Sequence, residues 1–331
     1  MHFLNPLAKK TKTSSPEEKR SLVRKLKHNS ITWIDIENPK RKEMNQLAEE
    51  FAFDPLHLDA CIQKGQLDQL SIEDKYIFIL LRTPRYDQQE NKVTAHKVCI
   101  FLNKNTVVTV HRDSELSTAD LFKEVESDEK RRDEVMKKSA AYLTYHLLEA
   151  LVTDVSSLLD IILQEVDEID DLVFDVNVSG AYSISQLRQK IMRQRRVISS
   201  FKTMLQDLSA SKTELIDTTT RYYSSLTMRM KRLSETLEEA RETVEIYKDA
   251  DFTVSTERTN KILGILTIIF TLGIPATIVG SFYGMNILIP GGIEAGSWTF
   301  WGPFTTFYLV MVMAIGPAVL MLLLFKYKKW F

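Results

Sequence analysis

Residues 262–283 read ILGILTIIFTLGIPATIVGSFY, a run of 22 residues without a charged side chain. A second uncharged run of 22 residues, FTTFYLVMVMAIGPAVLMLLLF, covers residues 304–325. A helix of this length rises about 33 Å at ~1.5 Å per residue, enough to cross a ~30 Å hydrocarbon core. A buried core helix would explain one such run, but two of them favour a pair of transmembrane helices. Pro275 and Pro317 fit this interpretation, since neighbouring helices can satisfy the carbonyls that a proline leaves free.

The charges that flank the two runs predict their orientation. Arg258 and Lys261 precede the first run, and three lysines, Lys326, Lys328 and Lys329, follow the second. The loop between the runs has neither lysine nor arginine. The positive-inside rule therefore predicts a multi-pass protein of the plasma (inner) membrane with both termini in the cytoplasm.

The composition before residue 262 is that of a soluble domain. Nine of the eleven glycines lie at Gly264 or later, so a polar, glycine-poor part precedes an apolar, glycine-rich tail. The net charge of −1 indicates no nucleic-acid partner. Cys61 and Cys99 form no CxxC pair, and we expect two buried reduced thiols. Residues 1–28 are rich in lysine and arginine, and we expect a flexible basic extension there.

The soluble part begins with a pattern of strands and helices. Residues 31–36 and 76–81 are predicted strands, and residues 97–102 and 106–110 a hairpin. Helical segments are expected at residues 41–50 and 55–62. These elements predict a small α/β domain.

Beyond residue 132 the pattern is helical. One apolar stripe is formed by Leu143, Leu147, Leu151, Val155, Leu158, Ile162, Val166 and Ile169. Gly180 ends that helix, and a second helix begins near Ser183. No glycine or proline occurs in residues 181–261. There a seam with alternating spacings of four and three predicts packing along a partner helix, at Leu226, Met230, Leu233, Leu237, Ala240, Val244 and Tyr247.

No helix-stop signal separates this seam from the first apolar run. A single helix over residues 218–283 would be about 100 Å long at ~1.5 Å per residue. It would carry cytoplasmic events mechanically to the membrane. The alternative is a break at residues 249–251.

One face of the first apolar run mixes hydroxyl and apolar side chains at spacings of three and four, at Asn260, Leu263, Thr267, Phe270, Ile274, Thr277 and Ser281. Hydroxyls can bond the water shell of a cation, and apolar constrictions can gate by dewetting. The alternative for each hydroxyl is a bond to its own helix. Two spans cannot enclose a pore alone, so a homo-oligomer is implied.

The first run ends in Tyr283-Gly284-Met285-Asn286, at the predicted outer mouth. Neither run contains a carboxylate, so a bare divalent ion would lack charge compensation there. Mg²⁺ gives up water reluctantly and is often held through its water shell. The carboxamide of Asn286 is therefore predicted to read a hydrated ion.

These features resemble the CorA family of divalent-cation channels. The family signature is Gly-Met-Asn at the outer end of the first of two C-terminal spans, and Gly284-Met285-Asn286 matches it. The resemblance extends to the start at Trp33-Ile34-Asp35, the long helix, and Asn260 and Pro275. The basic tail of residues 326–330 matches as well.

The resemblance implies a funnel-shaped homopentamer in a lipid bilayer, with five Asn286 side chains around its mouth. It matches five residues to pore-lining positions: Asn260, Leu266, Ile274, Thr277 and Ser281. The lysines of the tail would ring the inner mouth. In magnesium members, intracellular Mg²⁺ closes the pore by bridging acidic residues between subunits.

Two departures leave the ion open. The loop after Asn286 has Glu294 as its one acid, and the position expected to hold a regulatory aspartate falls near Ser225. An acidic cluster, Glu165, Asp167, Glu168, Asp170, Asp171 and Asp175, is either a solvated helix face or a regulatory cation site. The favoured function is uptake of hydrated Mg²⁺, with Co²⁺ or Ni²⁺ as further ions. The alternatives are a proton-coupled Zn²⁺ transporter of the ZntB type and a membrane-anchored protein without a pore.

The predicted architecture is an α+β cytoplasmic domain with a long stalk helix and two C-terminal transmembrane helices. We expect neither an enzyme nor an organic cofactor. The expected divisions are an extension at 1–28, an α/β domain at 29–132, a helical hairpin at 133–217, a stalk at 218–261, spans at 262–283 and 304–325 with a loop at 284–303, and a tail at 326–331.

Overall fold

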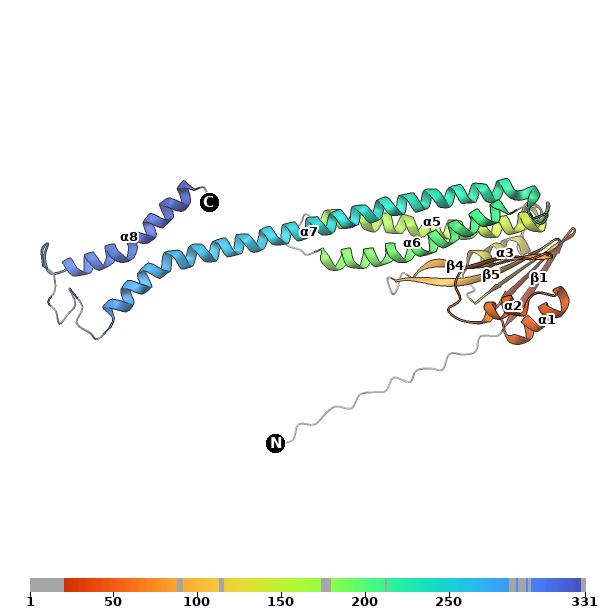
Figure 1. Ribbon diagram of the computed structural model, residues 1–331, viewed down its shortest axis with the longest axis horizontal. Helices are drawn as coiled ribbons and strands as arrows, with labels where there is room; N and C mark the ends of the chain where they lie inside the picture. The colour runs from red at the N-terminus through yellow and green to blue at the C-terminus, as the bar shows by residue number, and fades with distance from the viewer. Residues whose placement is uncertain are drawn as a thin grey trace, which may run out of the picture. The chain divides into compact units, whose positions relative to one another are not determined.

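The computed structural model describes residues 21–87, 92–112, 116–173, 180–211, 213–285, 290, 296 and 299–328. The chain divides into two compact units. The first takes the described residues up to Leu172 and those of Gly180–Lys248, and the second takes Val173 and the described residues of Asp249–Phe331. Figure 1 shows the order of the elements along the chain.

The first unit contains a mixed six-stranded sheet in the order β1-β2-β6-β5-β4-β3. Its strands are β1 (Leu22–His28), β2 (Ile31–Glu37), β3 (Gln69–Ile72), β4 (Tyr76–Asp87), β5 (Lys92–Asn103) and β6 (Thr106–His111). β2 and β6 pair in parallel, and the other neighbours pair antiparallel. The strands expected from the sequence are all present, and the β5–β6 hairpin is confirmed.

β1 corrects one expectation. Residues 22–28 belong to the sheet rather than to a flexible extension, because Leu22 to His28 pair with Glu37 to Ile31 across a tight turn at Asn29. Asn29 takes a left-handed φ of 52°, a conformation that asparagine tolerates better than most residues. The basic residues of this segment had favoured the interpretation as a flexible extension. They suit an edge strand, where charge discourages further pairing.

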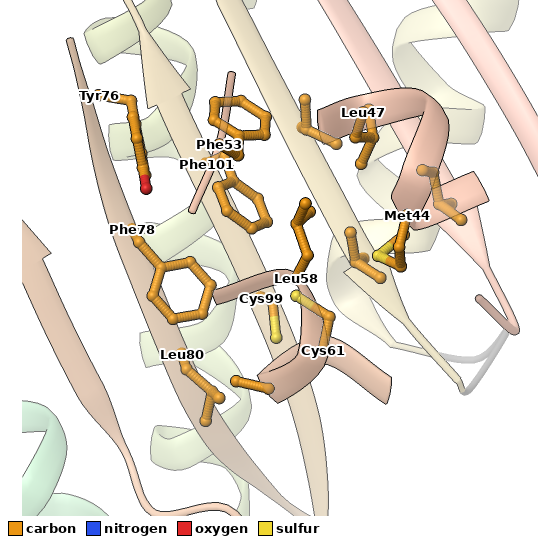
Figure 2. Packing of buried hydrophobic residues seen from close by; sticks show 14 of the residues in the cluster. Met44, Leu47, Phe53, Leu58, Cys61, Tyr76, Phe78, Leu80, Cys99 and Phe101 are labelled. Atoms are coloured by element: carbon orange, nitrogen blue, oxygen red, sulfur yellow. The ribbon is translucent and has the colours of Figure 1, made fainter. Parts of the chain in front are cut away.

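Two helices, α1 (Arg41–Phe51) and α2 (Pro55–Ile62), pack on the sheet and close a buried apolar cluster. Figure 2 shows the side chains of both helices meeting those of the strands. At its centre Phe53 stacks on Phe101, with ring centroids 4.4 Å apart. Cys61 and Cys99 are both buried and form no disulfide, as expected.

A buried polar network ties β2 to β6. The carboxylate of Asp35 accepts a hydrogen bond from Thr109 Oγ1 at 2.6 Å and is paired with Arg24 Nη2 at 2.6 Å. His111 Nε2 lies 3.1 Å from the same carboxylate. Burial alone would raise the pKa of Asp35, but the bonds and charge of these neighbours outweigh it, and the pKa lies below its ordinary value. The network connects the two strands of the parallel pair through buried side chains.

The helical part of the first unit comprises α3 (Ser117–Ser127), α4 (Glu129–Met136), α5 (Ala140–Val173), α6 (Ala181–Ala210) and the start of α7 (Thr220–Tyr283). Within this unit α5, α6 and α7 run side by side (Figure 1). The apolar stripe predicted for α5 is confirmed, since all eight of its residues are buried.

α7 is one unbroken helix of 64 residues, so the break considered at residues 249–251 does not occur. Its seam packs as predicted: five of the seven residues are buried, and Leu233 and Tyr247 are half-buried. Two ion pairs one heptad apart hold α6 against α7, Arg188 Nε to Glu245 at 3.0 Å and Arg195 Nε to Glu238 at 3.3 Å.

The second unit contains the rest of α7 and α8 (Thr305–Tyr327). By length and composition, α7 and α8 each contain a segment able to cross a membrane. Apolar side chains are exposed along both segments of the single chain, Phe270 at 63 % and Val312 at 66 % among them. Such surfaces require a cover of lipid or of other copies.

Candidate ion pathway

The membrane segment of α7 carries the predicted pore face. At 100° per residue, the seven residues from Asn260 to Ser281 fall within an arc of about 100°, and Leu266 lies about 20° beyond it. All eight side chains are exposed in the single chain. One helix thus presents a continuous stripe with an amide and hydroxyls alternating with apolar side chains.

The threonine hydroxyls on this segment bond back to their own helix. Thr267 Oγ1 donates to the carbonyl of Leu263 at 2.8 Å, and Thr277 Oγ1 donates to the carbonyl of Gly273 at 3.0 Å. Each hydroxyl has one proton and two acceptor lone pairs. Because the proton is used within the helix, both oxygens are left as acceptors. A hydrated cation presents water hydrogens, and acceptors are the groups that can bind them.

Thr271 has the same geometry and was not part of the predicted face. Its Oγ1 donates to the carbonyl of Thr267 at 2.6 Å. At 100° per residue it lies about 20° outside the arc, on the side of Asn260, and about 120° around the helix from Thr277. Threonine is thus not confined to the predicted face. The bond back to the helix does not distinguish a pore-lining threonine from a structural one, and only the angular position around the helix axis can do so.

The end of α7 is tightly turned. The N–H of Gly284 donates to the carbonyl of Gly280 at 2.9 Å, and the N–H of Met285 donates to the carbonyl of Phe282 at 3.2 Å. A Cβ at position 284 would lie 3.1 Å from the oxygen of Gly280, so a side chain there would be tight against this carbonyl. The hydroxyl of Tyr283 donates to the carbonyl of Pro290 at 3.4 Å, which ties the helix end to the following loop.

Several predicted site residues lie outside the described residues: Asn286, Glu294, Lys329 and Asp175. Of the basic tail, Lys326 and Lys328 are described, and both are exposed. Lys326 lies in the last turn of α8, where a cation is favoured by the helix dipole. The predicted lysine ring therefore has two of its three members at the end of a helix.

The acidic cluster on α5 is partly engaged by other side chains. Glu165 is paired with Lys190 Nζ at 2.5 Å, and both are largely buried. Burial raises the pKa of Tyr247, and its bond to the Asp170 carboxylate raises it further. Asp167 and Glu168 are exposed, and the side chain of Asp171 is not described. Across the described part of the chain, no three of these or other His, Cys, Asp and Glu side chains are grouped to hold a metal ion.

Known proteins are similar to this chain in sequence over most of its length. A family model described as "CorA-like Mg2+ transporter protein" matches residues 28–328. The cobalt/magnesium transport protein CorA of Thermotoga maritima is 29 % identical over 304 residues, covering 90 % of this chain and 83 % of its own. The zinc transport protein ZntB of Vibrio parahaemolyticus is 26 % identical over 179 residues, covering 54 % of each chain.

Among solved structures, the CorA magnesium transporter of Methanocaldococcus jannaschii superposes with a TM-score of 0.75 at 19 % identity. The match covers 92 % of this chain and 93 % of the other. At that identity the likeness establishes the fold, an α/β domain followed by a long helix and two C-terminal apolar helices.

Proposed function

We propose that this chain, which belongs to the family of CorA-like Mg²⁺ transporters, is a membrane channel for hydrated divalent cations, with Mg²⁺ as the main ion. The observation that carries the proposal is the stripe on α7. Its threonine hydroxyls donate their hydrogen bonds to backbone carbonyls of the same helix, so their oxygens remain free to accept hydrogen bonds. The absence of any carboxylate from residues 262–283 and 304–325 supports passage of the ion with its water shell.

The pore requires several copies of the chain. Two helices cannot surround an ion path, and the exposed stripe of α7 needs partners, so a homo-oligomer lines the pore with one α7 from each subunit. A homopentamer is the assembly that the resemblance implies. Five Asn286 carboxamides then ring the outer mouth, and Lys326, Lys328 and Lys329 ring the inner one.

The orientation of the chain supplies the driving force. Both termini are cytoplasmic under the positive-inside rule, so Asn286 faces the outside of the plasma membrane. A potential of 100 mV is worth about 2.3 kcal/mol per charge, and a divalent ion therefore gains about 4.6 kcal/mol on moving inward. Uptake needs no further energy source. Co²⁺ and Ni²⁺ are further ions for the same pore.

Two regulatory features belong to the proposal. The unbroken α7 links the cytoplasmic seam to the pore stripe within one helix. The exposed carboxylates of Asp167 and Glu168 are candidates for a cytoplasmic cation site completed by another subunit.

A proton-coupled Zn²⁺ transporter is the second candidate. The similarity to the Vibrio zinc transport protein over 179 residues favours it. Against it, neither membrane run contains an acid, a histidine or a basic side chain that could carry a proton.

Ion flux into proteoliposomes separates the candidates. The purified chain is reconstituted, and influx of Mg²⁺, Co²⁺ and Zn²⁺ is followed with an internal dye, with and without a pH gradient. We expect Mg²⁺ influx driven by the membrane potential alone. Zn²⁺ influx that requires the gradient would support the second candidate, and no influx of any ion would refute both.

The Asn286→Ala variant tests the outer mouth. We expect loss of Mg²⁺ influx with an unchanged oligomer in size-exclusion chromatography. Asn103→Ala, at the end of β5, is the control and should transport normally. Normal influx by an intact Asn286→Ala oligomer would show that this carboxamide does not read the ion.

A further inference from the structure

α6 is a strongly basic helix in the first unit. It contains six lysines and arginines, and Asp207 is its one acid. Two surface hollows of about 650 and 430 Å³ lie along it, and both are lined by Met192 and Arg196. The larger one also reaches β3 through Gln69 and Leu70. Because they share two residues, the hollows form one groove, called here the α6 groove.

Arg196 differs from the other arginines of this helix. Arg188 and Arg195 are paired with glutamates of α7, and Arg193 donates to the carbonyl of Val93 at 3.4 Å. Arg196 is exposed, and among the described residues it has no ion pair. Its exposed guanidinium therefore lies where the two hollows meet. A guanidinium of this kind presents a planar set of donors that matches phosphate oxygens.

The wall beyond Arg196 adds hydroxyls, of which Thr203 Oγ1 already donates to the carbonyl of Ser199 at 3.0 Å and those of Ser199 and Ser200 are candidate donors. Ser199, Ser200 and Thr203 follow it at spacings of three, four and seven, so they lie along the same side of the helix and line the larger hollow. Asp68 also lines this hollow, but its carboxylate accepts from both the Nε and the backbone N–H of Arg82, at 2.9 and 3.1 Å. Its charge is thus already compensated, and Asp207 lies at the far end.

The groove has an apolar part beside the cation. The side chain of Met192, one turn before Arg196, is 38 % exposed, and Leu70 and Met204 line the same hollow. The flexible, polarizable thioether of methionine packs well against the flat aromatic ring of a ligand. A ligand for this surface therefore combines a row of anionic oxygens with an apolar ring system. A hollow of 650 Å³ is within the usual range for small-molecule sites.

We propose that the α6 groove binds a nucleoside triphosphate. The phosphate chain lies along Arg196 and the hydroxyls of Ser199 and Ser200, and the base lies over Met192. Phosphate oxygens are also the groups through which nucleotides hold Mg²⁺. The occupancy of the groove would therefore respond to how much nucleotide is free of Mg²⁺, in a chain of the Mg²⁺ transporter family.

Equilibrium binding to the full-length chain in detergent tests this assignment. ATP and inorganic triphosphate are titrated by calorimetry, each in EDTA and again with excess Mg²⁺. We expect ATP to bind in EDTA, and to bind more tightly than triphosphate because of the contact with Met192. Arg196→Gln should weaken ATP binding by about tenfold or more, since charge-assisted bonds to phosphate are the strong ones.

Arg232→Gln is the control, because Arg232 is exposed on α7 outside both hollows and its loss changes the net charge equally. Ser199→Glu is a second variant that places a carboxylate in the groove and should also weaken ATP binding. Equal ATP binding by wild type and Arg196→Gln, or no ATP binding by wild type, would overturn the site. Equal affinity for ATP and triphosphate would overturn the nucleoside assignment. The measurement needs no ion flux, so it is independent of the transport proposal.

Discussion

Replacing Thr277 by valine removes one oxygen from the proposed pore stripe without changing the shape of the side chain. Thr277 Oγ1 donates its proton to the carbonyl of Gly273, and the lone pairs that remain are the groups proposed to accept from the ion's water shell. A hydrogen bond contributes about 0.5–1.5 kcal/mol net. If a hydrated ion meets two such oxygens at this level, the barrier rises by roughly 1–3 kcal/mol, a reduction of about 5- to 150-fold in flux.

The chain provides a matched control for this substitution. Thr271→Val removes the same group, with the same bond to a carbonyl four residues earlier, at a position just outside the predicted arc and about 120° around the helix from Thr277. Thr277→Ser keeps the hydroxyl and should keep most of the flux. Mg²⁺ influx into proteoliposomes at a fixed potential, normalised to the amount of reconstituted oligomer, measures all three variants.

Two results would refute the reasoning. Unchanged flux in Thr277→Val would mean that this hydroxyl does not face the ion path. Equal losses in Thr277→Val and Thr271→Val would mean that the predicted face does not separate hydroxyls that line the ion path from those that do not.

Three further predictions concern the first unit. Asp35→Asn should lower the free energy of unfolding by about 3 kcal/mol, because it breaks a buried charge pair and leaves a guanidinium without its partner; urea unfolding followed by the fluorescence of Trp33 measures it. Burial lowers the pKa of His146 in the folded chain. The stability contributed by the neutral imidazole is therefore fully present above the pKa of the unfolded chain, about 6.5, and is lost as the pH falls below that value. Thermal melts between about pH 7 and pH 5 should therefore show a shallower slope for His146→Gln. The exposed pair of Arg195 and Glu238 should show a coupling energy below about 1 kcal/mol in a double-mutant cycle.

Periodicity made the helices predictable and left parts of the sheet unrecognised. The stripe of α5 and the seam of α7 repeat at helical spacing over many turns, and both pack as that spacing requires. β1 has three basic residues and a histidine in seven positions, and it belongs to the sheet because β2 supplies its backbone partners. β3 has four residues, which is too few to show a period.

Contacts between distant residues were beyond sequence reasoning. Asp35 and His111 are 76 positions apart, and the parallel pairing of β2 with β6 brings them together. The sequence marked Asp35 as part of a strand but gave no sign that its carboxylate would be buried with three partners. The arginines of α6 are a similar case, because the sequence shows their charge, while only the structure shows that Arg188 and Arg195 pair with α7 and that Arg196 has no ion pair within the described part of the chain.

The hydroxyls of α7 show that two interpretations of a threonine in a membrane helix are compatible. A bond back to the helix was the alternative to a role in the pore, yet Thr267 and Thr277 make that bond while their oxygens keep acceptor capacity. A hydroxyl that kept its proton for the pore would offer a donor to water oxygens, and the waters around a cation turn those oxygens toward the ion. Back-bonding therefore orients the hydroxyl correctly for a hydrated cation, and it would disfavour a hydrated anion, whose waters turn their hydrogens inward. The same bond that stabilises the helix thus contributes to the sign of the charge that the stripe accepts.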